Sequence, residues 1–199
     1  MAHIDYFFSP MSPYTYLLGG DLETVADKHN ATVTYKPLDI MGLFARTGGT
    51  APKDRHASRM EYRAQDLVRS AKKRAMAFNL KPAFSPTNPA PSSYAIIAAQ
   101  SAGGGDIGAL VHSFTRACWA EDKDIADDAV VRACLKAAGF DPALADSGLL
   151  SGADTYASNL EEAVRRGAFG APFFITGDDA RFWGRDRITD LDLYLAGDL

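Results

Sequence analysis

The first hydrophobic and polar residues of the chain alternate. Within residues 3–8, Ile4, Tyr6 and Phe8 would share one side of an extended segment, and the residues between them the other. A period of two is typical of a β-strand, because successive side chains of a strand point to opposite faces. Residues 3–8 are therefore predicted to form a short strand.

The spacing of the apolar residues changes after a turn at residues 9–12. From Pro13 the apolar positions recur at helical spacing, which predicts a helix over residues 13–29. Ser12 is a favoured residue type for its N-cap, and proline suits a first helical turn. A glycine inside a helix costs about 1 kcal/mol relative to alanine. At Gly19-Gly20 we therefore expect the close approach of another backbone rather than a break.

A second strand-like segment, residues 31–38, ends at a proline. Strand, helix and strand in this order predict a βαβ unit with a right-handed crossover. The middle of the chain is alanine-rich and helically periodic, with Gly- or Pro-rich linkers between the periodic segments. Five helices are predicted there, over residues 57–78, 92–101, 108–120, 126–138 and 154–166.

The last part of the chain returns to strand patterns. Two strands are predicted at residues 171–176 and 181–183, and a closing helix carries Ile188, Leu191 and Leu195. Each terminal piece alone is too small to bury a sheet, but together they supply four strands and two helices for one layered α/β domain. We therefore expect a discontinuous domain of residues 1–44 and 167–199, with residues 45–166 as an all-helical insertion.

Composition and charge exclude several classes of protein. With 199 residues, 47% of them hydrophobic, the chain can fill a substantial core. The formal charge of -4 comes without a basic block, so a nucleic acid or an anionic membrane surface is not expected as a partner. The chain shows no signal-peptide pattern and no apolar run long enough to cross a bilayer, which predicts a cytoplasmic protein.

The side chains suited to thiol or metal chemistry are few. Cys118 and Cys134 are the only cysteines, and their separation fits neither a disulfide framework nor a zinc site. Both are predicted to be small core residues, so any thiol chemistry has to come from a ligand. The four histidines form no metal-binding pair, and we expect no metal. Residues 103–108 match GxGxxG but follow a helix-like segment, so a dinucleotide site is rejected.

Three short segments have both a structural and a functional interpretation. Ser12 is explained by capping alone, yet a helix N-terminus also attracts anions such as a thiolate. Pro172 opens a strand; spacing alone favours a trans turn proline, whereas a cis bond would let the backbone of Ala171 pair with an extended ligand. Asp186, flanked by Arg185 and Arg187, suits either a helix cap or the recognition of a zwitterionic amino acid.

These segments together resemble a known family. Residues 8–17, FSPMSPYTYL, are similar to the F-x-S-P-Y-S-Y-L start of the 2-hydroxychromene-2-carboxylate isomerases, which are related to the kappa-class glutathione transferases. Residues 169–174, FGAPFF, and 182–187, FWGRDR, are similar to two later motifs of that family. The order of elements extends the resemblance over the whole chain. It implies a thioredoxin-like fold of the DsbA type with an inserted helical domain.

The resemblance implies bound glutathione. Ser12 would hydrogen-bond its sulfur, Ala171 with a cis Pro172 would pair with its cysteinyl backbone, and Arg185 with Asp186 would hold its γ-glutamyl end. The same wall would be lined by Phe182, Trp183 and Gly184. Redox relatives carry Cys-x-x-Cys at the turn, whereas residues 12–15 here read SPYT, so a dithiol redox cycle cannot occur there.

A second glutathione segment of the family reads N-x-P-P…P-x-K-G-x-Y-M. Counted back from Tyr62, its asparagine falls on Thr50, its proline on Pro52 and its lysine on Arg59. Two polar positions are therefore altered, and arginine does not reproduce the point charge of lysine. The basic cluster of Arg46, Lys53, Arg55 and Arg59 suits either a solvated face or the attraction of a carboxylate substrate. Arg46, Pro52 and the loop around Phe84 and Asn88 are candidates for substrate contact. A small aromatic carboxylate is the implied substrate, and a homodimer the implied assembly.

The implied reaction interconverts 2-hydroxychromene-2-carboxylate and trans-o-hydroxybenzylidenepyruvate. A thiolate that adds to a conjugated double bond and later leaves would make that bond rotatable. A kappa-like glutathione transferase or peroxidase is an alternative, and it would consume glutathione stoichiometrically. A thioredoxin-fold protein that binds without turnover is a third reading, and lack of a glutathione-dependent thermal shift would support it.

Overall fold

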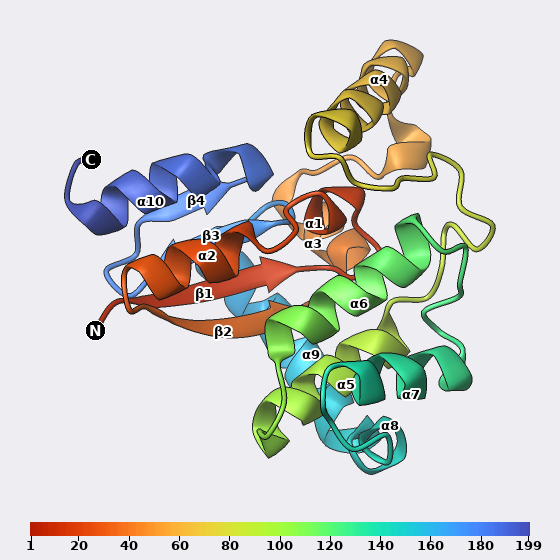
Figure 1. The fold of residues 1–199 in the computed structure, drawn as a ribbon. Coiled ribbons are helices and arrows are strands. Elements are labelled where there is room, and N and C mark those ends of the chain that lie inside the picture. The colour runs from red at the N-terminus through yellow and green to blue at the C-terminus, as the bar shows by residue number, and fades with distance from the viewer.

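A single mixed β-sheet forms the centre of the protein in the computed structural model, which describes residues 1–199 (Figure 1). The strand order is β2-β1-β3-β4, with β1 parallel to β2 and antiparallel to β3. The strands are β1 (His3–Phe8), β2 (Thr32–Pro37), β3 (Phe173–Thr176) and β4 (Arg181–Trp183). The four predicted strands and the α/β class are confirmed.

The helix expected over residues 13–29 is instead two helices. They are α1 (Pro13–Tyr16) and α2 (Asp21–Lys28). Gly19 lies between them with a φ of +61°, a left-handed conformation that L side chains rarely adopt. A Cβ at this position would lie 3.1 Å from Nη2 of Arg74. The expectation of an unbroken helix was wrong, because a break occurs at these glycines and an arginine side chain approaches it.

Each face of the sheet has its own hydrophobic cluster. Ile4, Tyr6 and Phe8 point into the larger cluster, which is shared with α2, the helical block and α10 (Ile188–Ala196). Phe7 lies in a smaller cluster on the opposite face, with residues of α3 (Ile40–Thr47) and of the segment around the end of α9 (Leu149–Arg165). The alternation predicted for β1 is therefore confirmed, since neighbouring residues of the strand belong to different clusters.

The middle of the chain is helical, as predicted. Besides α9, the block contains η1 (Pro52–Asp54), α4 (Ala57–Lys73), α5 (Ala90–Ala102), α6 (Ile107–Trp119), α7 (Asp128–Ala137) and α8 (Leu144–Ser147). The short helices α3 and α8 were not predicted. Figure 1 shows α5 to α8 gathered beside β2, α9 passing behind the strands and α4 projecting away from the other helices. The domain boundaries stay a prediction; α5 and α9 both contact β2.

Amide side chains from α5 and α9 form hydrogen bonds with backbone groups on the outer edge of β2. The Gln100 side chain accepts a hydrogen bond from the backbone N–H of Tyr35 at 2.8 Å and donates to its carbonyl at 3.1 Å. Asn159 of α9 donates to the carbonyl of Pro37 at 2.9 Å. Side chains here replace the neighbouring strand that an edge otherwise lacks.

Several smaller expectations can be checked directly. Cys118 and Cys134 are both buried and unpaired, as predicted. The stretch of residues 103–108 joins α5 to α6 and does not follow a strand, so the rejection of a dinucleotide loop is confirmed. None of the helices combines the length and the apolar character that crossing a bilayer requires.

Candidate active site

Ser12 occupies the turn between β1 and α1. Its backbone is extended (φ -82°, ψ 125°), and its Oγ accepts a hydrogen bond from the N–H of Thr15 at 3.4 Å. The predicted N-cap is confirmed, and Ser12 as a residue is half-buried. Because α1 is only four residues long, few peptide dipoles add up at its start, and the attraction of this turn for an anion is correspondingly small.

The segment before β3 presents an unpaired piece of backbone. The Ala171–Pro172 peptide bond is cis, the arrangement that the resemblance implied, so the trans proline favoured by spacing alone was wrong. The carbonyl of Pro172 accepts a hydrogen bond from the N–H of Gly184 at 2.9 Å, which ties this segment to the end of β4. In contrast, neither the N–H nor the carbonyl of Ala171 has a hydrogen-bond partner in the protein. One donor and one acceptor are thus available for a ligand with its own backbone.

The absence of a side chain at Gly170 leaves room for the indole of Trp183 beside this segment. A Cβ on Gly170 would lie 2.2 Å from Nε1 of Trp183, so any other residue would displace the indole. The Trp183 ring also meets the ring of Phe169 at 4.8 Å between centroids. The tryptophan is nevertheless 54% exposed and forms an open apolar wall.

Ser12 and Ala171 line the same cavity, whose volume is about 940 Å³. Its walls come from the α1 turn, from α3, from one side of α4 and its preceding loop, and from the segments that flank β3 and β4. A cavity of this size can enclose a small organic ligand.

The cavity is positively charged. Its lining contains five arginines and two aspartates. Arg185 donates to Oγ of Ser70 and lies 3.9 Å from the Asp66 carboxylate, so this guanidinium is fixed against α4. Asp186 contacts Arg187 at 3.4 Å and caps no helix, which leaves its exposed carboxylate accessible from the cavity. An anion that also carries an amino group suits this distribution of charge.

Burial and the arginines change two pKa values in the cavity wall. Burial raises the pKa of Tyr14, and the nearby guanidinium of Arg63 opposes that rise only in part. Burial also lowers the pKa of Arg55, and the positive charges of Arg63 and Arg59 lower it further. The tyrosine is therefore a neutral hydroxyl at physiological pH, and the arginines repel one another.

The cavity unites most of the residues that were predicted from the sequence. Those in its lining are Ser12, Pro52, Arg59, Ala171, Pro172, Trp183, Gly184, Arg185 and Asp186. Five others lie outside it, and their predicted ligand contacts stay predictions. Arg46 pairs with Glu161, and the carbonyl of Thr50 accepts a hydrogen bond from Arg55. Phe84 lies in the α4–α5 loop, Asn88 just before α5 accepts a hydrogen bond from the N–H of Ala90, and Phe182 contacts the ring of Tyr194.

Two charged residues of the lining were missed in the sequence. Arg63 and Asp66 follow Arg59 on α4 at spacings of four and three residues. Residues at these spacings share one side of a helix, so the assignment of Arg59 to the site could have led to Arg63 and Asp66 as well.

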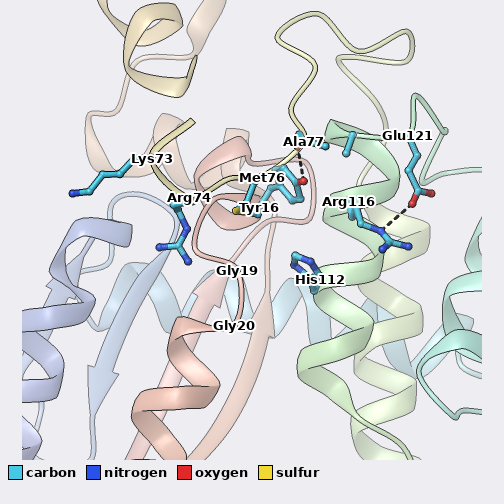
Figure 2. A pocket seen from close by; sticks show the side chains of 11 residues that line it. Tyr16, Gly19, Gly20, Lys73, Arg74, Met76, Ala77, His112, Arg116 and Glu121 are labelled. Carbon is cyan, nitrogen blue, oxygen red and sulfur yellow. Dashed lines mark hydrogen bonds and ion pairs between the residues drawn. The ribbon is translucent and has the colours of Figure 1, made fainter. Parts of the chain in front are cut away.

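A second cavity, of about 790 Å³, lies beyond the end of α1 (Figure 2). The hydroxyl of Tyr16 donates to the carbonyl of Ala77 at 2.6 Å there, and its ring stacks on His112. This cavity shares no lining residue with the first and contains no serine, threonine or cysteine. The first cavity is therefore the candidate active site.

The sheet order, the Ser12 turn and the cis proline opposite it define a protein of the thioredoxin-like class. The chain belongs to the DsbA-like thioredoxin domain family, whose pattern matches residues 3–196. The fold predicted from the motifs is confirmed.

Curated relatives carry one recurring name. A protein named 2-hydroxychromene-2-carboxylate isomerase from Sphingobium xenophagum is 29% identical over 195 residues, which cover 96% of this chain and 97% of the relative. A protein of the same name from Pseudomonas putida is 27% identical over 95% of this chain and 92% of its own length. A solved structure of a 2-hydroxychromene-2-carboxylate isomerase superimposes with a TM-score of 0.78 at 20% identity, and the match covers 98% of this chain and 95% of the other. The resemblance inferred from the motifs is therefore confirmed.

Proposed function

We propose that this protein is a glutathione-dependent isomerase that interconverts 2-hydroxychromene-2-carboxylate and trans-o-hydroxybenzylidenepyruvate in the breakdown of aromatic compounds. The names of its relatives support an enzyme of the isomerase kind. The observation that carries the glutathione part is the unpaired backbone of Ala171, which lines one cavity together with the Ser12 hydroxyl.

The residues of the cavity fit glutathione group by group. The tripeptide has a backbone near its thiol, to which Ala171 offers a donor and an acceptor. Its γ-glutamyl end is a zwitterion, and Arg185 and Asp186 offer one charge of each sign. Its glycyl carboxylate suits Arg59 on α4.

When bound, glutathione would supply a thiolate that adds reversibly to the conjugated double bond and so permits rotation about it. The task of Ser12 is then to donate its hydroxyl proton in a hydrogen bond to the sulfur, which favours the charged form. The excess of arginines over aspartates in the cavity also favours a thiolate, because opposite charges nearby lower a thiol pKa. The short α1 adds little to this effect.

The turnover of a chromene carboxylate, followed by absorbance with and without glutathione, tests this proposal. We expect turnover only with glutathione, and no net consumption of the thiol. Ser12→Ala is expected to lower kcat about 100-fold, because one lost donor at a developing charge costs that order of magnitude. Full activity without glutathione would refute the proposal, and stoichiometric loss of the thiol would indicate a transferase instead.

A further inference from the structure

Three cavity arginines have no acidic partner. Arg185 and Arg187 pair with aspartates, but Arg55, Arg59 and Arg63 form no salt bridge. All three belong to α4 or to the segment just before it. The mutual repulsion noted for Arg55 would be relieved by an anion between these guanidinium groups.

Two of the three are held in place by aromatic rings. The Arg63 guanidinium lies over the ring of Tyr14, 5.7 Å from its centroid, and that of Arg55 lies over the ring of Phe44 at 5.6 Å. Nε of Arg55 also donates to the carbonyl of Thr50 at 2.8 Å. Both groups are half-buried, and Nε of Arg63 is buried without any partner. Stacked and partly desolvated guanidinium groups bind carboxylates better than freely moving surface ones.

The charges of glutathione do not account for this pair. The tripeptide has two carboxylates, for which Arg59 and Arg185 suffice in the proposed function. Arg55 and Arg63 remain, beside the apolar faces of Tyr14 and Phe44.

We propose that Arg55 and Arg63 form a separate carboxylate subsite, which binds an aromatic carboxylate with its ring beside Phe44 and Tyr14. The subsite makes the enzyme selective for substrates that carry an acid group, whereas neutral electrophiles of the same shape bind weakly. The assignment of this subsite to the substrate rests on the proposed function. Its affinity for an aromatic carboxylate does not depend on that function.

Binding of an unreactive acid and its ester tests the subsite without turnover. The probes are 4-phenyl-2-oxobutanoate, which has no double bond to rotate, and its methyl ester, both titrated calorimetrically into the apoprotein. We expect the acid to bind at least tenfold more tightly than the ester, since hydrogen bonds to charged groups are worth about that factor. Arg63→Met and Arg55→Met should each remove most of this preference and leave the ester unchanged.

Arg69→Met is the matched control. Arg69 is an exposed arginine on the same helix, whose guanidinium lies over the ring of Tyr62, and it does not line the cavity. It should keep the full preference for the acid. Arg63→Lys separates charge from geometry, because lysine retains the charge without the planar fork and should restore only part of the preference.

The two proposals fail in distinguishable ways. Equal affinity for acid and ester, or a preference that survives Arg63→Met and Arg55→Met, would overturn the subsite even if glutathione-dependent turnover is found. A preference that depends on both arginines would support the subsite even if no isomerase turnover is found. With turnover present, the arginine variants should raise KM for the acid more than they lower kcat.

Discussion

The guanidinium of Arg74 binds the carboxylate of Asp21 through two hydrogen bonds of 2.6 and 2.7 Å, and it also donates to the carbonyl of Leu18 at 2.9 Å. Arg74 directly follows α4, and Asp21 begins α2. This one side chain therefore joins the helix that carries the cavity arginines to the loop that follows Ser12 and α1.

Loss of this side chain should destabilise the fold. Arg74→Met leaves Asp21 and the Leu18 carbonyl without their donor, and we expect the free energy of unfolding to fall by about 1.5–3 kcal/mol, the range for hydrogen bonds to charged groups. Partial exposure of the pair places the effect near the lower end. Urea denaturation measures it. Arg69→Met on the same helix should change the stability by less than about 0.5 kcal/mol, and an equal loss in both variants would contradict the role given to Arg74.

Replacing Ser12 separates capping from ligand binding. Ser12→Ala removes the acceptor for the Thr15 N–H, which should lower the free energy of unfolding by about 1 kcal/mol. The same change should weaken the binding of glutathione. Ser12→Asp keeps an N-cap acceptor, so its stability should be close to that of the wild type. Its carboxylate would repel a thiolate, however, and glutathione should bind still more weakly than to the alanine variant. Thermal unfolding and calorimetry measure the two effects. Normal glutathione binding by Ser12→Asp would show that the sulfur does not lie at Ser12.

Glu23 should make the stability depend on pH. Burial raises its pKa, and the hydrogen bond from the Tyr35 hydroxyl at 2.6 Å opposes the rise only in part. Because the folded pKa lies above the unfolded one, the folded state binds the proton more tightly, and this contribution is lost as the pH rises through the folded pKa. Glu23→Gln should therefore match the wild type near pH 4 and become increasingly more stable than it toward pH 8. Melting temperatures across that range test the sign, and a gap that narrows with rising pH would contradict it.

Gln100 should protect the edge of the sheet. Gln100→Leu removes both partners of Tyr35, and each buried backbone group left unpaired costs about 1–3 kcal/mol. We expect a loss of stability together with faster amide hydrogen exchange at Tyr35. Gln65→Leu on the exposed side of α4 is the control for the change from amide to leucine. Unchanged exchange at Tyr35 would show that water replaces the glutamine without cost.

Local patterns predicted more of the fold than of the cavity. The alternation around Tyr6 and the helical spacing of the middle segments depend on neighbours in sequence, so strands and helices could be predicted from the sequence. The break at Gly19 depends on Arg74, which is distant in the chain. Thr50 was placed by its spacing from Tyr62, yet it does not line the cavity, and its carbonyl accepts a hydrogen bond from Arg55. Side-chain direction in a loop follows from tertiary contacts, which spacing does not encode.

The amides of Gln100 and Asn159 also limit how two copies of this protein can associate. A sheet grows across molecules only where an edge strand has free N–H and carbonyl groups. At β2 these two side chains already bind the groups of Tyr35 and Pro37, and the opposite edge strand, β4, is only three residues long. Two molecules therefore cannot readily merge their sheets into one continuous sheet. Assembly, where it occurs, has to bring helical or loop surfaces together.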